Sequence, residues 1–411
     1  MLDINLIRQN PDKIKEGIKR KNVNPKIVDD FLAFDKIWRE LVKKSDNLRA
    51  SQKKLGKENI EEAKKIKQQI RLIEKELKQI EIQREEVLFQ MPNLPFDNVP
   101  FGENEKGNIV LREFGKKQKI DFSPKDHLEL AKNLDIIDFE TASKVSGSGF
   151  YYLKNQGVFL EIALIHFALD FLKEKGFSLW LTPNLAKKQF YTGTGYFPKG
   201  PEAQTYVIEE SDLGLIATSE VTLAGIHSNE ILAQDDLPKY YAGYSQCFRQ
   251  ESGAYGKYSK GFYRVHQFSK VEMFVYAKPE ESQSIHEKLL SIEEELWQKL
   301  GIPYKVLEMC TGDLGAQAAK KFDLEAWMPG RGDWGEITST SNTTDYQARR
   351  LNIRFKKENG EIGFAHTLNG TAIAVSRAFV AILENYQQKD GSVLIPEILQ
   401  KYLGFDKISK R

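Results

Sequence analysis

Hydrophobic positions in the first 90 residues recur with the spacing of a coiled coil. Apolar residues fall at Ala63, Ile66, Ile70, Ile73, Leu77, Ile80 and Val87, in steps of three and four that pass over Arg84 before Val87. A second seam runs upstream through Phe34, Trp38, Leu41, Leu48 and Leu55. Because Gly56-Lys57-Glu58-Asn59 lies between the seams, we predict two helices of about 30 residues that reverse there and pack antiparallel, giving an arm about 45 Å long.

The pattern changes after the prolines at 92, 95 and 100, which end the second helix and mark a linker. An amphipathic helix is predicted over 160–175, a strand over 177–183, strongly β-forming residues near 240–277, a helix over 281–300, a strand near 364–368 and an apolar helix over about 372–386. Extended strands grouped between long helices favour an α+β fold with an antiparallel sheet flanked by helices. We therefore expect an N-terminal domain over 1–100, with its arm at about 28–90, and a second domain over 101–411.

Charge is unevenly distributed along the chain. The 411 residues carry a net charge of only +2, yet residues 43–71, around the expected tip of the arm, contain ten basic and four acidic residues. A solvated coiled-coil surface and a phosphate-binding arm explain this excess equally well, so charge alone leaves both open.

Composition excludes several other classes. Two isolated cysteines, Cys247 and Cys310, and histidines without metal-binding spacing argue against a disulfide scaffold or a zinc site. The N-terminus lacks the pattern of a signal peptide, and no stretch has the 18 or so apolar residues of a membrane span. We expect a cytoplasmic protein with no membrane segment.

Neither a P-loop nor a Rossmann fingerprint is present, so any ATP site is built differently.

Alternating residues of 247–276 place unusual chemistry on one side of a predicted strand pair. Arg249 and Glu251 share a face of the first strand, because alternate residues of a strand point the same way. On the second strand, one face carries Arg264, His266, Phe268 and Glu272. The opposite face carries the apolar Val265, Val271, Met273 and Val275. A solvent-facing surface would carry Lys, Thr and Ser instead. Phe268 and Glu272 are about 13 Å apart along a strand, which suits a ligand with an aromatic base at one end and a polar group at the other.

Two further residues call for a charged partner. Arg377 lies in an apolar stretch, TLNGTAIAVSRAFVAILENY, and a buried guanidinium requires an anion, either a protein carboxylate or a ligand phosphate. Gly370 precedes it and would allow close backbone approach. Glu336 opens a run rich in hydroxyl groups, Glu336-Ile337-Thr338-Ser339, and would be a magnesium ligand in a phosphate site.

These segments together resemble a known family. FRQE at 248–251, RVHQF at 264–268 and Glu272 resemble motif 2 of class II aminoacyl-tRNA synthetases, the stretch through Arg377 resembles motif 3, and the segment ending at Pro183 resembles motif 1. TSE at 218–220, GTGYFPKG at 193–200, EITSTSNTTDYQARR at 336–350, HTLNGT at 366–371, ILENYQ at 382–387 and NLIRQNPDKIKEGIKRK at 5–21 resemble the seryl-tRNA synthetases, of the bacterial type, over essentially the whole chain. The class I signatures are absent.

The resemblance implies a role for each matching residue. It implies an ATP site, with Mg²⁺ near Glu336 and Ser339, made by Arg249, Gln250, Glu251, Phe268, Glu336, Ile337, Thr338, Ser339 and Arg377. Phe268 would stack on adenine opposite Arg377, and Arg249, Arg377 and Glu336 would be catalytic. It implies an L-serine site made by Thr218, Ser219, Glu220, Arg249, Glu272, Asn369 and Thr371.

The resemblance also implies partners. It implies ATP-dependent formation of seryl-adenylate and transfer to tRNA(Ser), held by the arm and the 252–263 loop, in a homodimer; a selenocysteine tRNA as a second acceptor stays open. Ala372 and Ser376 stand where many members have glycine, and we interpret these small changes as tolerated. The alternatives are a paralogue that loads a small amino acid onto a non-tRNA acceptor and a non-catalytic RNA-binding paralogue. The basic arm argues against the first, and the presence of Arg249, Glu251, Glu336 and Arg377 against the second.

Overall fold

The chain forms two compact units, Met1–Pro95 and Phe96–Arg411. The computed structural model describes residues 1–55, 59–196, 205–251 and 261–410. The sequence places the boundary at residue 100, whereas Phe96 already belongs to the second unit, where its N–H donates to the carbonyl of Ala319 at 3.0 Å.

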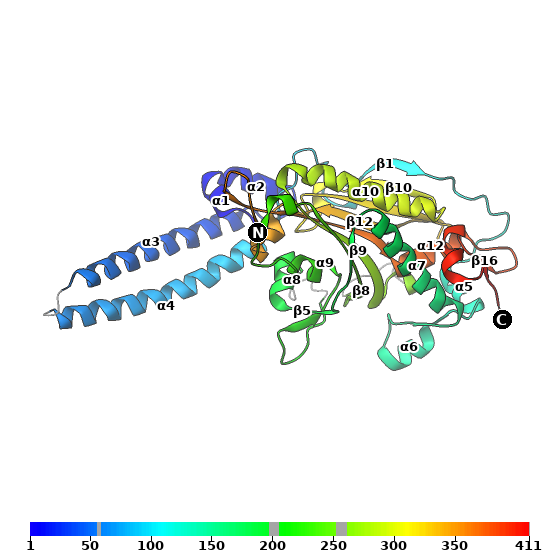
Figure 1. Ribbon diagram of the computed structural model, residues 1–411, viewed down its shortest axis with the longest axis horizontal. Helices are drawn as coiled ribbons and strands as arrows, with labels where there is room; N and C mark the ends of the chain where they lie inside the picture. The colour runs from blue at the N-terminus through cyan, green and yellow to red at the C-terminus, as the bar shows by residue number, and fades with distance from the viewer. Residues whose placement is uncertain (56–58, 197–204, 252–260, 411) are drawn as a thin grey trace. The chain divides into compact units, whose positions relative to one another are not determined.

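The N-terminal unit is entirely helical in its described residues. Two short helices, α1 (Ile4–Gln9) and α2 (Pro11–Lys19), precede two long ones, α3 (Lys26–Lys54) and α4 (Ile60–Gln90), which run side by side (Figure 1). The long helices contain 29 and 31 residues, as the heptads predict. Gly56–Glu58 of the expected reversal lie outside the described residues. At the base, α1, α2, α3 and α4 enclose a core of Ile7, Ile14, Ile18, Val28, Phe31 and Leu88.

The break in the heptad at Arg84 marks a buried ion cluster. Asp35 of α3 is fully buried and accepts hydrogen bonds from Arg84 of α4 and Arg8 of α1, each at 2.8 Å. Burial alone raises the pKa of Asp35, but the two arginines outweigh it and bring the pKa below its ordinary value. The Arg84 guanidinium also lies over the ring of Trp38, 4.8 Å from its centroid. A polar pair within an apolar seam fixes which residues of the two helices face each other.

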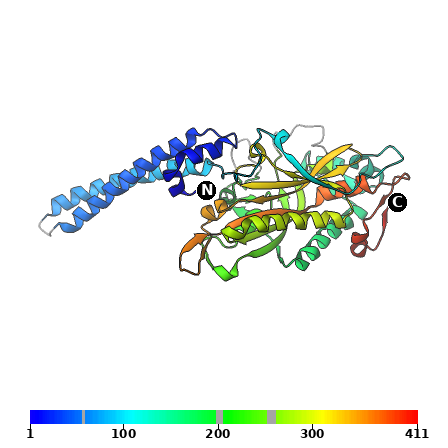
Figure 2. The same cartoon turned by 90° about the horizontal axis from the view of Figure 1, so that it is seen from above.

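The second unit is built on one eight-stranded sheet (Figures 1 and 2). Its strand order is β1-β10-β11-β12-β15-β9-β8-β4, antiparallel throughout except for the parallel edge pair β4 and β8. The strands are β1 (Ile109–Phe114), β4 (Ser178–Leu181), β8 (Lys239–Phe248), β9 (Gln267–Ala277), β10 (Tyr304–Glu308), β11 (Lys320–Met328), β12 (Asp333–Asn342) and β15 (His366–Ala374). The expected α+β architecture with an antiparallel sheet is confirmed.

Helices cover the two faces of this sheet differently. The long helices α7 (Gln156–Glu174), α10 (Ser282–Lys299) and α12 (Val375–Asn385) share one core with Val271, Met273 and Val275, the apolar face of β9. On the other face, α8 (Lys188–Thr194), α9 (Glu220–Gly225) and α11 (Tyr346–Leu351) lie at one end, around Phe274 and Tyr276. The polar face of the central strands stays open to form a pocket. None of the described helices has the length and apolar character to cross a membrane.

The remaining elements are short and lie around the sheet. They are α5 (His127–Asn133), α6 (Phe139–Ser146), α13 (Glu397–Leu403), β2 (Ile137–Asp138), β3 (Tyr152–Leu153), β5 (Leu185–Lys187), β6 (Leu213–Leu215), β7 (Ile231–Ala233), β13 (Arg354–Lys356), β14 (Ile362–Phe364), β16 (Val393–Leu394) and β17 (Lys407–Ile408).

Two β-bulges lie in the adjacent strands β12 and β15. In β12, Leu324 pairs with Thr338 and Glu325 with Glu336, which leaves Ile337 as the extra residue. In β15, Glu272 pairs with Thr371 and Val271 with Ile373, which leaves Ala372 unpaired. A bulge reverses the alternation of side chains after it, so residues an odd number of positions apart come to share a face.

Three predicted boundaries are wrong. The apolar helix begins at Val375 rather than near 372, because 366–374 pairs along its length with β9 as strand β15. The first strand ends at Phe248 and the second begins at Gln267, so Arg249, Glu251, Arg264 and His266 lie beyond the paired strands. Glu251 has a positive φ of 49°, which no strand residue adopts.

Candidate active site

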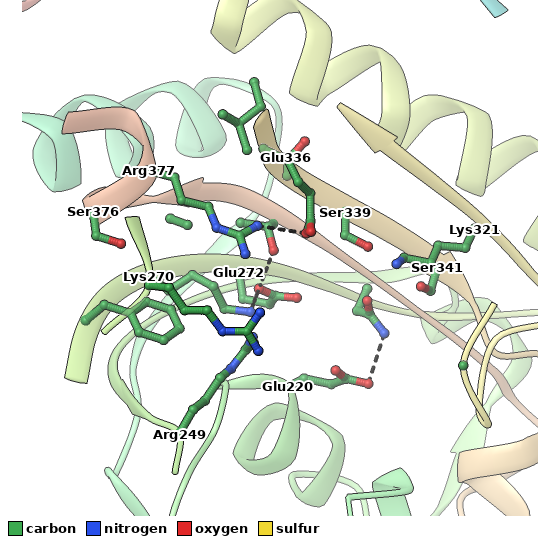
Figure 3. Close-up of a pocket in the computed structure, with 18 of the residues that line it drawn as sticks. Glu220, Arg249, Lys270, Glu272, Lys321, Glu336, Ser339, Ser341, Ser376 and Arg377 are labelled. Atoms are coloured by element: carbon green, nitrogen blue, oxygen red, sulfur yellow. Dashed lines mark hydrogen bonds and ion pairs between the residues drawn. The ribbon is translucent and has the colours of Figure 1, made fainter. Parts of the chain in front are cut away.

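A cavity of about 460 Å³ lies over the open face of the central strands. Strands β9, β12 and β15 form its floor, and the residues after β8 together with α12 form one wall (Figure 3). Of the residues predicted from the sequence, it gathers Glu220, Arg249, Glu251, Phe268, Glu272, Glu336, Ile337, Thr338, Ser339, Asn369, Thr371 and Arg377. Residues up to 157 positions apart in the chain, Glu220 and Arg377, therefore meet at one site.

Three predicted residues do not line the cavity. Thr218 accepts a hydrogen bond from the N–H of Glu220 at 3.2 Å, and the Ser219 hydroxyl donates to the carbonyl of Gly243 at 3.1 Å. Gln250 donates to the carbonyl of Thr205 at 3.1 Å. These residues hold the backbone next to Glu220 and Arg249. The loop predicted to contact tRNA lies outside the described residues over 252–260.

The bulges explain how the floor acquires its polar residues. Glu336 and Ser339 are three positions apart and would point to opposite faces of a regular strand, yet both line the cavity because Ile337 bulges between them (Figure 3). On the other face, Thr338 donates to the fully buried Glu293 of α10 at 2.9 Å. Gly370 also faces Glu293: a Cβ there would lie 2.8 Å from its Oε1. Gly370 therefore makes room for a carboxyl group behind the sheet.

The anion that Arg377 requires is Glu336. Arg377 Nη1 lies 2.8 Å from Glu336 Oε1, and its guanidinium lies over the ring of Tyr263, 5.2 Å from the centroid. Burial alone raises the pKa of Glu336, but Arg377 and Lys321 outweigh burial and lower the pKa to about 2. The pKa of Arg377 is raised, because Glu336 outweighs its burial. This end of the cavity thus holds a permanent carboxylate beside a permanent cation.

A second guanidinium faces the same space. Arg249 lies over the ring of Phe268, 5.3 Å from its centroid, and its Nε donates to the carbonyl of Ala217 at 3.3 Å. Glu251 forms an ion pair with Arg264. Arg249 thus lies over Phe268, and Arg377 lies over Tyr263. Two guanidinium groups beside aromatic rings suit a planar base with attached phosphates, because guanidinium groups both stack and bind oxyanions.

Two buried carboxylates mark the opposite end. Glu220 accepts hydrogen bonds from Tyr196 at 3.0 Å, Gln347 at 2.7 Å and Asn369 at 2.9 Å. Burial, followed by the charge of Glu272, raises the pKa of Glu220 to about 7. An ammonium group next to Glu220 would favour the ionised form of this buried carboxyl group, so the site suits a ligand with an amine.

Glu272 forms the second carboxylate of this end. It is buried, forms an ion pair with Lys270 and accepts a hydrogen bond from Thr371 at 3.2 Å. Lys270 was missed in the sequence although it alternates with Phe268 and Glu272, so strand parity could have found it. Tyr196, Gln347 and Lys321 were also missed. Tyr196 and Gln347 lie within the motifs at 193–200 and 336–350, whereas no local pattern identifies Lys321.

The wall formed by Gly312–Gln317 was missed as well. It is held by the linker segment, residues 96–108, which follows the N-terminal unit. The N–H of Thr311 donates to Pro100 and that of Gly312 to Gly102, both at 2.9 Å, and Asn108 donates to Asp313 at 2.8 Å. A Cβ on Gly312 would lie 2.4 Å from the carbonyl of Glu103, so only glycine fits beneath the linker segment.

The residues around Glu336 offer ligands for a magnesium ion. No group of three or more His, Cys, Asp or Glu residues among the described positions could hold a metal by itself. Magnesium in phosphate sites needs only one or two carboxylates, because phosphates and water complete its shell. The partly exposed Glu336 carboxylate, with its low pKa, and the nearby Ser339 hydroxyl fit such an ion.

Sheet, pocket and motifs together define the class of protein. Residues 205–386 match the family described as the tRNA synthetase class II core domain (G, H, P, S and T). The prolyl-tRNA synthetase of Giardia lamblia in complex with prolyl-adenylate shares the fold, with a TM-score of 0.57 at 18% identity over 68% of this chain and 57% of that chain. The fold and its site are those of a class II aminoacyl-tRNA synthetase.

Full-length relatives identify the family within this class. Residues 1–95 match the seryl-tRNA synthetase N-terminal domain. The chain is 51% identical to the serine–tRNA ligase of Dictyoglomus turgidum over 99% of both chains. It aligns with seryl-tRNA synthetase from Pyrococcus horikoshii complexed with ATP at a TM-score of 0.93 and 43% identity, covering 100% of both chains. The chain belongs to the seryl-tRNA synthetase family, and the alternatives considered from the sequence are not favoured.

Proposed function

We propose that the pocket activates L-serine with ATP and transfers the seryl group to tRNA(Ser), with two arginines serving the phosphates and two carboxylates serving the amino acid. The observation that carries this proposal is the separation of charge within one cavity. Arg249 lies over the ring of Phe268 and Arg377 pairs with Glu336, whereas Glu220 and Glu272 are a separate pair of buried carboxylates that line the same cavity.

At the phosphate end, Phe268 stacks on adenine, with Arg249 and Arg377 available to bind the triphosphate. Glu251 and the backbone of Gln250 position the nucleotide, and the 336–339 strand lies along it. Two guanidinium groups can neutralise the charge that develops at the α-phosphate, because fixed cations stabilise a transition state without reorganising. When bound, Mg²⁺ would be held by Glu336 and Ser339 and would neutralise phosphate charge.

At the amino-acid end, Glu220 binds the α-ammonium group and Glu272 accepts the hydroxyl hydrogen of serine, with Thr371 beside it. Asn369 holds Glu220, and Thr218 and Ser219 hold the backbone before it. A site that hydrogen-bonds a hydroxyl rejects an amino acid that lacks one, because its own polar groups would be left unpaired.

The two steps then require little covalent chemistry from the protein. The serine carboxylate attacks the α-phosphorus and pyrophosphate leaves. A ribose hydroxyl at the 3′ end of the tRNA attacks the carbonyl carbon of the adenylate, and AMP leaves. Arg249 is placed to hold both the serine carboxylate and the α-phosphate, so catalysis comes from positioning and charge stabilisation.

The arm supplies a surface for the tRNA. Within the described part of the arm, only two of the basic residues of 43–71 have carboxylate partners, in the pairs Arg49–Glu74 and Lys64–Glu61. The attraction within such solvent-exposed ion pairs is weak. The other cations are available to phosphates, and their binding would weaken with salt. Residues 252–263 are proposed as a second contact.

An apolar surface on the second unit supports a homodimer. Val158, Phe159 and Ile162 lie exposed on α7, and Leu179, Trp180 and Leu181 lie exposed on the edge strand β4. Exposed apolar groups on adjacent elements are typical of protein interfaces. We place the protein in the cytoplasm, where the two free, buried cysteines stay reduced. Sedimentation at micromolar concentration tests the dimer, and a monomer would contradict it.

The activity is tested by ATP–pyrophosphate exchange with each of the twenty amino acids. We expect serine to stimulate exchange above all others. Equal stimulation by threonine or alanine, or none by serine, would contradict the proposal.

The role of the arm is tested by deleting residues 35–90. We expect the deletion to preserve exchange and to abolish tRNA charging. Normal charging by the truncated chain would show that tRNA binds elsewhere.

A further inference from the structure

Lys270 is a buried cation at the amino-acid end to which the proposed function gives no role. It lies on β9 between Phe268 and Glu272, and all three residues line the cavity, with Lys270 and Glu272 drawn in Figure 3. Only 5% of its surface is exposed. A lysine is rarely buried without a partner, so its contacts define what it does.

Its partner is one oxygen of Glu272. Lys270 Nζ pairs with Glu272 Oε2, and the Thr371 hydroxyl donates to the same Oε2 at 3.2 Å. The other oxygen, Oε1, accepts no hydrogen bond from any residue that the structure describes. The two protein donors thus occupy one oxygen of the carboxylate and leave the other available to the pocket.

The charge of Lys270 also acts on a second carboxyl group, that of Glu220. The charge of Glu272 raises the pKa of Glu220, and the charge of Lys270 lowers it. Without the lysine, Glu272 would be a buried and unpaired carboxylate beside a second acid.

We propose that Lys270 is a positioning residue for substrate selection: it holds Glu272 through Oε2, so that Oε1 is turned to accept the hydroxyl hydrogen of the amino acid. This inference rests on the proposed function. Selectivity for a hydroxyl group then belongs to Lys270 and Glu272 together. The Glu272 carboxylate accepts the hydrogen bond from the substrate, and Lys270, bound to Oε2, leaves Oε1 as the accepting oxygen. Alanine, which has no hydroxyl, gains nothing from the pair.

The test is Lys270→Met, assayed by ATP–pyrophosphate exchange with serine, with alanine and with varied ATP. We expect KM for serine to rise by about tenfold to 100-fold, the range of one hydrogen bond to a charged group. KM for ATP should stay within about twofold, and the preference for serine over alanine in kcat/KM should fall by the same factor as serine binding. Lys305→Met is the matched control, because Lys305 pairs with Glu325 at 2.7 Å in the same sheet but outside the pocket.

A double variant separates action through Glu272 from direct contact with the substrate. If Lys270 acts only through Glu272, then Lys270→Met should add little to Glu272→Gln, whose amide is neutral already. This comparison also serves if Lys270→Met alone fails to fold, because the double variant leaves no buried charge unpaired. A further rise in KM for serine in the double variant would overturn the proposal.

Two other results with Lys270→Met would overturn the proposal. One is an equal loss of kcat/KM with serine and with alanine, and the other is a change in KM for ATP alone. Unchanged KM for serine in Lys270→Met overturns this inference alone, provided that the wild-type chain prefers serine. A wild-type chain that does not respond to serine refutes the proposed function itself, whatever the lysine does.

Discussion

Replacing Glu220 with glutamine should make the free energy of unfolding less sensitive to pH. Burial, followed by the charge of Glu272, raises the pKa of Glu220 from 4.5 to about 7 in the folded protein. Between these values the folded chain holds a proton that the unfolded chain has released. The contribution of Glu220 to stability is therefore fully present below pH 4.5 and is lost as the pH rises to 7.

The size of the effect follows from the same two values. At about 1.4 kcal/mol per pKa unit, the rise corresponds to about 3 kcal/mol, of which about 2.5 kcal/mol is lost between pH 5 and pH 8. Glutamine is neutral throughout and fits the site. Its carbonyl can accept from Gln347 and Asn369 as Glu220 does now, and its amide can donate to the Tyr196 hydroxyl oxygen.

The measurement is urea unfolding of both proteins at pH 5 and pH 8, followed by tryptophan fluorescence. Four of the five tryptophans belong to the unit that contains Glu220. Relative to the glutamine variant, the wild type should lose about 2.5 kcal/mol over this range. Glu140→Gln, at an exposed position, is the control and should follow the wild type. Parallel curves for wild type and Glu220→Gln would refute the reasoning.

Three further changes test other parts of the structure. Arg377→Ala should lower the rate of pyrophosphate exchange by about 100-fold or more. The unfolding midpoint should change little, because the partly exposed Glu336 stays solvated. A loss of stability with exchange intact would show that the Arg377–Glu336 pair has a structural role only. Asp35→Ala should destabilise the helical unit by about 3–5 kcal/mol, since Arg84 is left buried and unpaired, and equal protease resistance of the arm would contradict this. Gly370→Ala should cost about 1–3 kcal/mol in urea unfolding because its Cβ meets a buried carboxyl oxygen, so an unchanged midpoint would show that the helix behind can move.

Sequence patterns predicted the features that depend on regular repetition. The heptads gave both long helices, and the interruption at Arg84 marks the ion cluster with Asp35. Alternation along β9 placed Phe268 and Glu272 on the pocket face, and the same rule would have included Lys270. These predictions succeed because each depends on neighbours within one element.

What could not be predicted depends on contacts between distant segments. The bulges at Ile337 and Ala372 exist only in the pairing of β12 and β15 with their neighbours, and they decide which hydroxyl groups face the cavity. Strand pairing also extends β15 to Ala374, where the composition favours a helix. Gln347 reaches Glu220 from a separate helix, a contact that no spacing in the sequence indicates.

The linker segment has a consequence for exchanging parts between related enzymes. Because residues 96–108 are bonded to the Gly312–Gln317 wall of the pocket, they travel with the catalytic half and not with the helices that precede them. A chimaera joined at Pro95 would import a foreign arm and keep its host's pocket wall intact. A junction only a dozen or so residues later would mix the linker of one enzyme with the wall of another, and serine activation could then fail for reasons unrelated to the imported helices.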